Sequence, residues 1–111
     1  MAGKFESWAT RDPKGLIKHL YISNDIHDLT YGLEALHRVK AYREEAYDLL
    51  LIKIQHNNAV VREGAIYGLT GFKTEEVIAI LYIMSKYDMN LSIRKIASEY
   101  LNDCLIASKW Y

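Results

Sequence analysis

The sequence of 111 residues has little cysteine, little proline and no excess of charge of either sign. The single cysteine, Cys104, excludes an intramolecular disulfide. Fourteen basic and fourteen acidic side chains cancel, so no overall positive field would attract nucleic acid or anionic lipid. These absences leave the arrangement of the apolar residues as the main source of information.

Long hydrophobic runs are also absent. The longest, around 49–54 and 77–85, are much shorter than the roughly 20 residues that cross a bilayer. The first six residues lack the apolar stretch of a secretory signal, so we expect a cytoplasmic protein that does not contact membranes. Apolar residues make up 50% of the chain, enough for one core, and we expect a single domain over 1–111.

Apolar residues recur at three- and four-residue spacings, which predicts helices, and strand-like alternation is absent. Asp12-Pro13 is typical of a helix start, and Thr74 and Asn90 are expected to cap later helices. We predict six helices after an N-terminal extension over 1–11. They lie at about 13–22, 25–39, 42–55, 58–70, 74–86 and 91–107.

An approximate repeat relates two of these helices. The segment 61–65 with Leu69 returns 32 positions later, from 61 to 93, as the segment 93–97 with Leu101. A repeat of this length predicts stacked helix pairs, here over 12–39, 42–70 and 74–107. The first pair contains only a degenerate copy.

The matching residues resemble the second helix of HEAT repeats, in the short form common in bacterial proteins. They are Val61-Arg62, Ala65 and Leu69 in one copy, and Ile93-Arg94, Ala97 and Leu101 in the other. The resemblance implies an all-α fold, a short α-solenoid of about three antiparallel helix pairs. Asp28-Leu29 departs from the motif as a capping repeat would. Ankyrin and tetratricopeptide repeats have similar lengths, but their motifs have no counterpart here.

In HEAT-like stacks the second helices line the concave surface, so their outward polar residues are the predicted partner-binding set. This set is mixed in charge and contains one aromatic residue, which suits a protein surface better than a phosphate backbone. The alternative interpretation is that these are solvated helix faces. The set is Thr30, Glu34, His37, Glu63, Tyr67, Thr70, Lys95, Glu99 and Asn102.

Other residues have competing interpretations. Arg62 and Arg94 are expected to make structural hydrogen bonds between repeats; the alternative is phosphate contact. The nine tyrosines are expected to pack in the core and at its edges instead of stacking on nucleic-acid bases. The C-terminal residues Leu105, Ile106, Trp110 and Tyr111 offer an apolar surface for a possible homodimer.

No pattern indicates chemistry. His27 and Glu34 lie two helical turns apart, too far for a shared metal ion, and no paired metal-ligand motif occurs. Cys104 shares an apolar helix face with Leu101, where a thiol is usually inert. A glycine-rich phosphate loop is missing as well. We therefore predict no catalytic residue, no metal site and no cofactor.

The leading hypothesis is a non-enzymatic protein-binding module, an inhibitor or immunity protein that neutralises one partner toxin or enzyme by direct binding. It rests on size and on analogy of fold. One alternative is a nucleic-acid-binding protein similar to the HEAT-like alkylpurine DNA glycosylases, which the neutral charge opposes. Another is a scaffold subunit of a larger complex.

Overall fold

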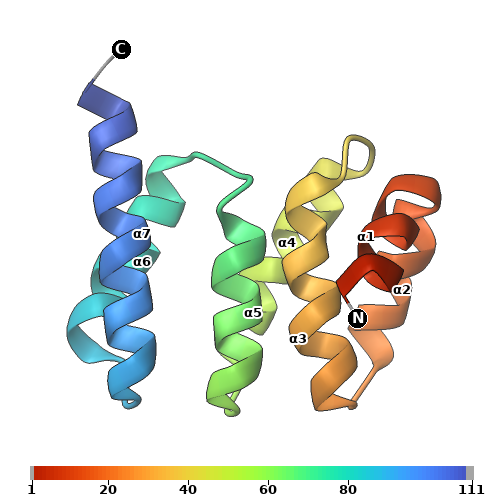
Figure 1. Cartoon of the computed structure of the whole chain (residues 1–111), viewed down its shortest axis with the longest axis horizontal. Coiled ribbons are helices and arrows are strands. Elements are labelled where there is room, and N and C mark those ends of the chain that lie inside the picture. Colours follow the sequence, from red (N-terminus) through yellow and green to blue (C-terminus); the bar gives the residue numbers. More distant parts are fainter. Residues whose placement is uncertain (1, 110–111) are drawn as a thin grey trace. The chain divides into compact units, whose positions relative to one another are not determined.

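The computed structural model describes the backbone of residues 2–109 and the side chains of residues 3–106. Every regular element in this range is helical, which confirms the predicted all-α fold. Figure 1 shows that short connections join consecutive helices. None of the described helices is both long enough and apolar enough to span a membrane.

The described chain contains seven α-helices and one short 3₁₀ helix. The structure places α1 at Ala2–Arg11, α2 at Pro13–Ile22, α3 at Ile26–Ala35, η1 at Leu36–Arg38, α4 at Arg43–Lys53, α5 at Ala59–Leu69, α6 at Glu75–Tyr87 and α7 at Leu91–Lys109. Six of them correspond to the predicted helices, and α1 is additional. The predicted helix over 25–39 ends its α-helical part at Ala35 and tightens into η1.

The chain divides into two units, one ending at Gly71 and the other beginning at Phe72. The sequence indicates one domain, and the boundary falls between two of the predicted helix pairs. The first unit holds α1 to α5, and the second holds the hairpin of α6 and α7.

The predicted helix starts are confirmed by side-chain hydrogen bonds. Asp12 Oδ1 accepts from the Gly15 amide at 3.1 Å, with Pro13 at the first helical position of α2. Thr74 Oγ1 accepts from the Val77 amide at 3.1 Å. Asn90 Oδ1 likewise accepts from Ile93. Each bond satisfies an amide that has no partner within its own helix, which fixes where the helix begins.

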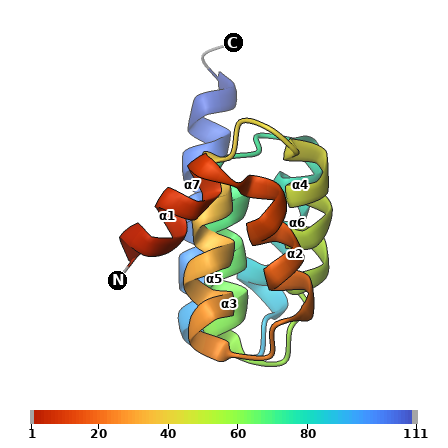
Figure 2. The same cartoon turned by 90° about the vertical axis from the view of Figure 1, so that its right-hand side faces the viewer.

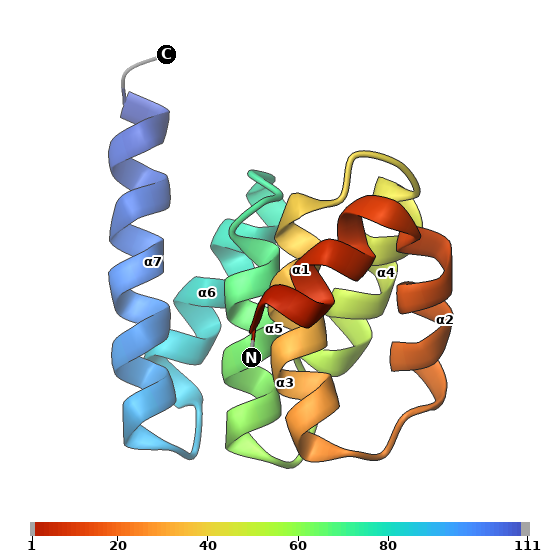
Figure 3. The ribbon, with the colours of Figure 1, turned by 45° about the vertical axis from the view of Figure 1, so that its right-hand side comes forward.

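Close packing of α3 and α5 organises the first unit (Figure 3). Gly64 and Gly68 of α5 face the backbone of α3, and a β-carbon at either position would overlap a carbonyl oxygen, that of Thr30 or that of Leu33. The two helices can approach this closely only because neither position carries a side chain. This register brings the outward residues of α3 and α5 side by side.

Helix α1 crosses the first helix pair and lies against α3 and α2, as Figure 2 shows. Phe5 and Ala9 are buried there, while the Trp8 ring lies 5.2 Å from the His19 ring on α2. Helix α1 falls in the segment 1–11 that is expected to be an extension, because the apolar residues of this segment are too few to reveal a helical period. Their burial depends on surfaces of α2 and α3 that come from elsewhere in the chain.

The second unit is a hairpin whose core lies between its two helices. Val77 and Leu81 of α6 and Ile93 and Ala97 of α7 are buried. The buried residues of α7 are those that match Val61 and Ala65 of α5, so the apolar half of the repeat describes the core in both units.

Candidate partner-binding surface

The first unit brings together six of the predicted partner-binding residues. Three of them lie on α3 or η1, and the other three lie on α5 or directly after it. The six residues are Thr30, Glu34, His37, Glu63, Tyr67 and Thr70. All six are partly buried, and the packing of Gly64 against Thr30 joins the two groups along one seam. This set is called the α3–α5 face below.

The α3–α5 face is ordered by its own short-range hydrogen bonds. Thr30 Oγ1 donates to the Ile26 carbonyl at 2.8 Å, and Thr70 Oγ1 donates to the Tyr67 carbonyl at 2.5 Å. Tyr67 Oη donates to Glu63 at 3.0 Å, one turn away. These bonds restrict the rotamers of the side chains, and side chains that are already ordered lose less entropy if they take part in binding.

The remaining three predicted residues lie on α7 in the second unit. Lys95, Glu99 and Asn102 are all exposed. Spacings of four and three residues place them on one side of the helix, away from the buried Ile93 and Ala97. They form a polar strip on the second unit, whereas the other six predicted residues belong to the first unit.

The connection between α6 and α7 exposes large apolar side chains that are not among the predicted partner-binding residues. Tyr87 is 77% exposed, Met89 is 96% exposed and Leu91 is 72% exposed. These three residues, called the turn patch, lie within five positions of one another around Asp88 and Asn90. Large apolar surface patches are uncommon on monomeric proteins and often mark binding sites. The sequence gives one signal of this exposure, because the apolar Met89 stands between the turn-forming residues Asp88 and Asn90.

The first unit repeats this feature at its own connections. Ile22, at the end of α2, is 73% exposed, and Ile26 across the same connection is also exposed. Ile52 and Val60 are exposed on either side of the α4–α5 connection. Exposed aliphatic or aromatic residues therefore flank the connection within each helix pair.

Arg62 has a structural role within its own helix pair. Its Nη1 donates to the carbonyls of His56 at 2.9 Å and Asn57 at 3.0 Å. Both acceptors lie in the connection that leads into α5, so these bonds close the turn of one helix pair. The guanidinium points back along the helix because side chains tilt toward the helix N-terminus.

Arg94 occupies the matching position in α7, but its environment is different. Its Nε is buried and has no hydrogen-bond partner among the described residues. A groove of about 570 Å³ lined by Ser85, Ser92 and Lys95 lies beside it. The repeat therefore conserves the position of the arginine without conserving the bonds that Arg62 makes.

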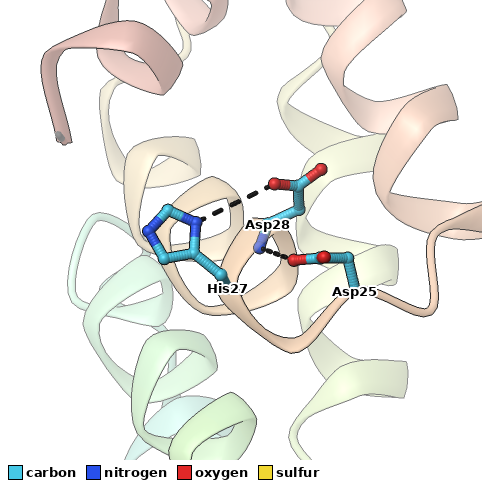
Figure 4. A group of neighbouring side chains, drawn as sticks. All are labelled: Asp25, His27 and Asp28. Atoms are coloured by element: carbon cyan, nitrogen blue, oxygen red, sulfur yellow. Dashed lines mark hydrogen bonds and ion pairs between the residues drawn. The ribbon is translucent and has the colours of Figure 1, made fainter.

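A small group of acidic and histidine side chains surrounds the start of α3 (Figure 4). Asp25 caps the helix through the Asp28 amide at 2.8 Å, and His27 Nδ1 lies 3.9 Å from Asp28. The other oxygen of Asp28 lies 3.0 Å from His19 Nε2 on α2. Capping and the bridge between α2 and α3 account for this cluster, and the positive end of the helix dipole opposes a bound cation there.

Two groups have shifted acidities. Burial, with the nearby charges of Lys53 and Arg62, lowers the pKa of His56. Burial raises the pKa of the Cys104 thiol, against the opposing effect of Lys73. A raised thiol pKa leaves less nucleophilic thiolate, which does not favour Cys104 as a catalytic group.

Comparison with known proteins finds no matching family model, no matching curated protein and no matching solved structure.

Proposed function

We propose that this chain is a non-enzymatic protein-binding module that acts by covering a surface of one partner protein. The exposure of the turn patch, Tyr87, Met89 and Leu91, is the observation that carries the proposal. Aromatic residues and methionine are enriched in the buried centres of protein interfaces, where a few large side chains provide most of the binding energy. The turn patch has this composition and is already accessible.

The α3–α5 face would add polar contacts in the first unit. Its hydroxyl groups and half-buried carboxylates, with Tyr67 held by Glu63, suit a polar protein surface. The same acidic groups disfavour a nucleic-acid partner, since Glu34 and Glu63 would repel a phosphate backbone and the net charge is zero. We therefore favour a protein partner over DNA or RNA.

Inhibition by steric blocking fits these surfaces. An inhibitor or immunity protein needs only complementary contact with a toxin or enzyme, which apolar anchors and polar surroundings provide. A HEAT-like origin, a cytoplasmic location and this biological role are parts of the proposal that rest on the sequence resemblance and on size. Exposed Leu105 and Ile106 on α7 support a homodimer as the competing use of the second unit. Trp110 and Tyr111 lie outside the described residues.

The test is affinity purification of the tagged chain from its native cells, with and without nuclease, followed by mass spectrometry. We expect one stoichiometric protein that survives nuclease and is lost from the Met89→Ser, Leu91→Ser double variant. The matched control is Lys86→Ser, Ser92→Ala, which alters neighbouring exposed positions without removing apolar surface. Recovery of nucleic acid alone, or equal recovery of the protein by the double variant, would contradict the proposal.

The homodimer alternative has a separate measurement. Sedimentation of the purified chain at several concentrations would reveal self-association, and Leu105→Ser, Ile106→Ser would abolish it if α7 forms the contact. A dimer that depends on these residues would assign the second unit to self-assembly.

A further inference from the structure

Tyr42 has a backbone conformation that its side chain disfavours. Its φ of 58° and ψ of 33° lie in the left-handed region, and it is the only non-glycine residue with positive φ among those described. Glycine or asparagine adopts this conformation at lower cost. Tyr42 is 44% exposed, so burial in the protein core compensates poorly for the strain. Such outliers are concentrated at functional sites.

Neighbouring hydrogen bonds hold the backbone of Tyr42 in place. The guanidinium of Arg43 donates to the Val39 carbonyl and to the Gly71 carbonyl, each at 2.8 Å. These bonds join the segment before α4 to the end of α5 within the first unit. The position of the Tyr42 backbone is therefore fixed by the bonds of its neighbour Arg43.

Tyr42 lines a basic groove. It has a volume of about 710 Å³, and its cationic lining residues are Arg11, Arg38 and Lys40. Arg38 lies 3.8 Å from Glu6, a long ion pair. Arg11 and Lys40 are exposed, and neither forms an ion pair within the described part of the chain. The basic groove therefore has cationic groups available for a ligand.

Tyr42 also lines a second groove, called the α2–α4 groove because its other lining residues come from α2 and α4. Its volume is about 440 Å³, and Ile17 contributes an apolar side chain that is almost fully buried. Lys14 and Lys18 line it from α2, and Glu45 and Asp48 line it from α4. Tyr42 is thus a lining residue that the two grooves share.

We propose that the two grooves together bind an extended acidic segment of a partner protein. One apolar side chain of the segment lies in the α2–α4 groove against Ile17 and Tyr42, and its carboxylates lie along Arg11 and Lys40 in the basic groove. Bidentate pairing of arginine with carboxylate makes such contacts directional. The inference rests on the proposed function only in taking the partner to be a protein.

A peptide fits this arrangement better than a nucleic acid. A polyanionic backbone that followed both grooves would meet Glu45 and Asp48 on the α4 side. An acidic peptide can place an apolar side chain at that point and keep its charges in the basic groove. The charge pattern thus selects a short acidic stretch that contains one large apolar residue.

The first experiment uses the whole chain and a fluorescein-labelled peptide, Glu-Asp-Phe-Glu-Asp, blocked at both ends. Fluorescence anisotropy gives its Kd beside those of Glu-Asp-Ala-Glu-Asp, Lys-Lys-Phe-Lys-Lys and a single-stranded oligonucleotide of five nucleotides. We expect the first peptide to bind at least tenfold more tightly than the other three. Absence of binding at millimolar concentration, or tighter binding of the oligonucleotide, would overturn the proposal.

Two variants locate the binding. Charge reversal by Arg11→Glu, Lys40→Glu should weaken peptide binding at least tenfold, whereas Lys86→Glu, an exposed lysine of the second unit, should leave it unchanged. Tyr42→Gly keeps the turn and removes the ring, and it should also weaken binding about tenfold, while Tyr42→Phe should not. If the charge-reversal variant or Tyr42→Gly bound the peptide with the same affinity as the parent chain, the two-groove site would be overturned.

The outcome is separable from the test of the proposed function. The Met89→Ser, Leu91→Ser variant should bind the peptide as the parent does, because the turn patch lies in the other unit. If this variant lost peptide binding although its two grooves are unchanged, the peptide would bind at the turn patch, and the two-groove site alone would be overturned.

Discussion

Gly64 of α5 lies directly against the backbone of Thr30 of α3, at a separation that leaves no room for a β-carbon. Gly64→Ala should therefore lower the free energy of unfolding by about 3 kcal/mol, since the two helices must move apart. Gly3→Ala is the matched control, because nothing lies within 4 Å of its added methyl group. The control should keep or raise stability by up to about 1 kcal/mol. Urea unfolding of both variants measures the difference, and equal stabilities would contradict the close approach.

Arg62→Ala should lower the free energy of unfolding by about 2 kcal/mol, because two carbonyls of the α4–α5 connection lose a charged donor. Arg94→Ala should cost less than about 1 kcal/mol, since its buried Nε has no hydrogen bond to lose. Thermal unfolding of the two variants side by side tests this. A larger loss of stability for Arg94→Ala than for Arg62→Ala would contradict the structural role given to the hydrogen bonds of Arg62.

Acid should destabilise the first unit through His56. The Asn58 amide donates to His56 Nδ1 at 3.0 Å, which requires that nitrogen to be unprotonated. Because the folded pKa is lowered from 6.5, the unfolded chain binds the proton first, and stability is lost as pH falls below about 6.5. Asn at this position can still accept the bond without titrating. The stability advantage of the parent over His56→Asn should shrink from pH 8 to pH 5, and a constant difference would exclude His56 as the cause.

Tyr42→Gly should change the free energy of unfolding by less than about 1 kcal/mol, because relief of the left-handed backbone offsets the greater freedom of glycine in the unfolded chain. Tyr42→Val is the contrasting variant. A β-branched residue tolerates positive φ poorly, so it should be clearly less stable than the parent. If Tyr42→Gly lost as much stability as Phe5→Ala, which removes a buried ring at a cost of about 3 to 5 kcal/mol, Tyr42 would be a core residue.

Cys104 should react slowly with iodoacetamide. Its raised pKa reduces the thiolate fraction at pH 8, so alkylation should be several-fold slower than that of a cysteine in a short unstructured peptide. The rate in 6 M guanidinium chloride provides the reference, where the chain should match the peptide. A folded chain that reacted as fast as the peptide would contradict the effect of burial.

The sequence was sufficient for the helical fold and for where most helices begin. Asp12, Thr74 and Asn90 are caps whose partners lie three residues away, so their effect is local and readable from the chain. Helix α1 was missed because the burial of Phe5 depends on α2 and α3, which the local pattern does not describe.

The candidate surfaces were less predictable than the fold. Helical period places Glu63 and Tyr67 on an outward face, and the structure joins them to α3 through Gly64. Apolar residues such as Met89 are expected in the core by their chemistry, and only the tertiary structure shows that this one is exposed. The left-handed backbone of Tyr42 also has no sequence signal, because a Gly or Asn normally marks such a position.

The position of α1 limits how this architecture can grow. Phe5 and Ala9 cover the side of α3 that a preceding helix pair would use for stacking, so any pair placed ahead of α1 in a longer chain would meet α1 itself. Added repeats would have to fold as a separate body or displace α1. The ten residues of α1 thus cover a helix surface although they carry no repeat motif.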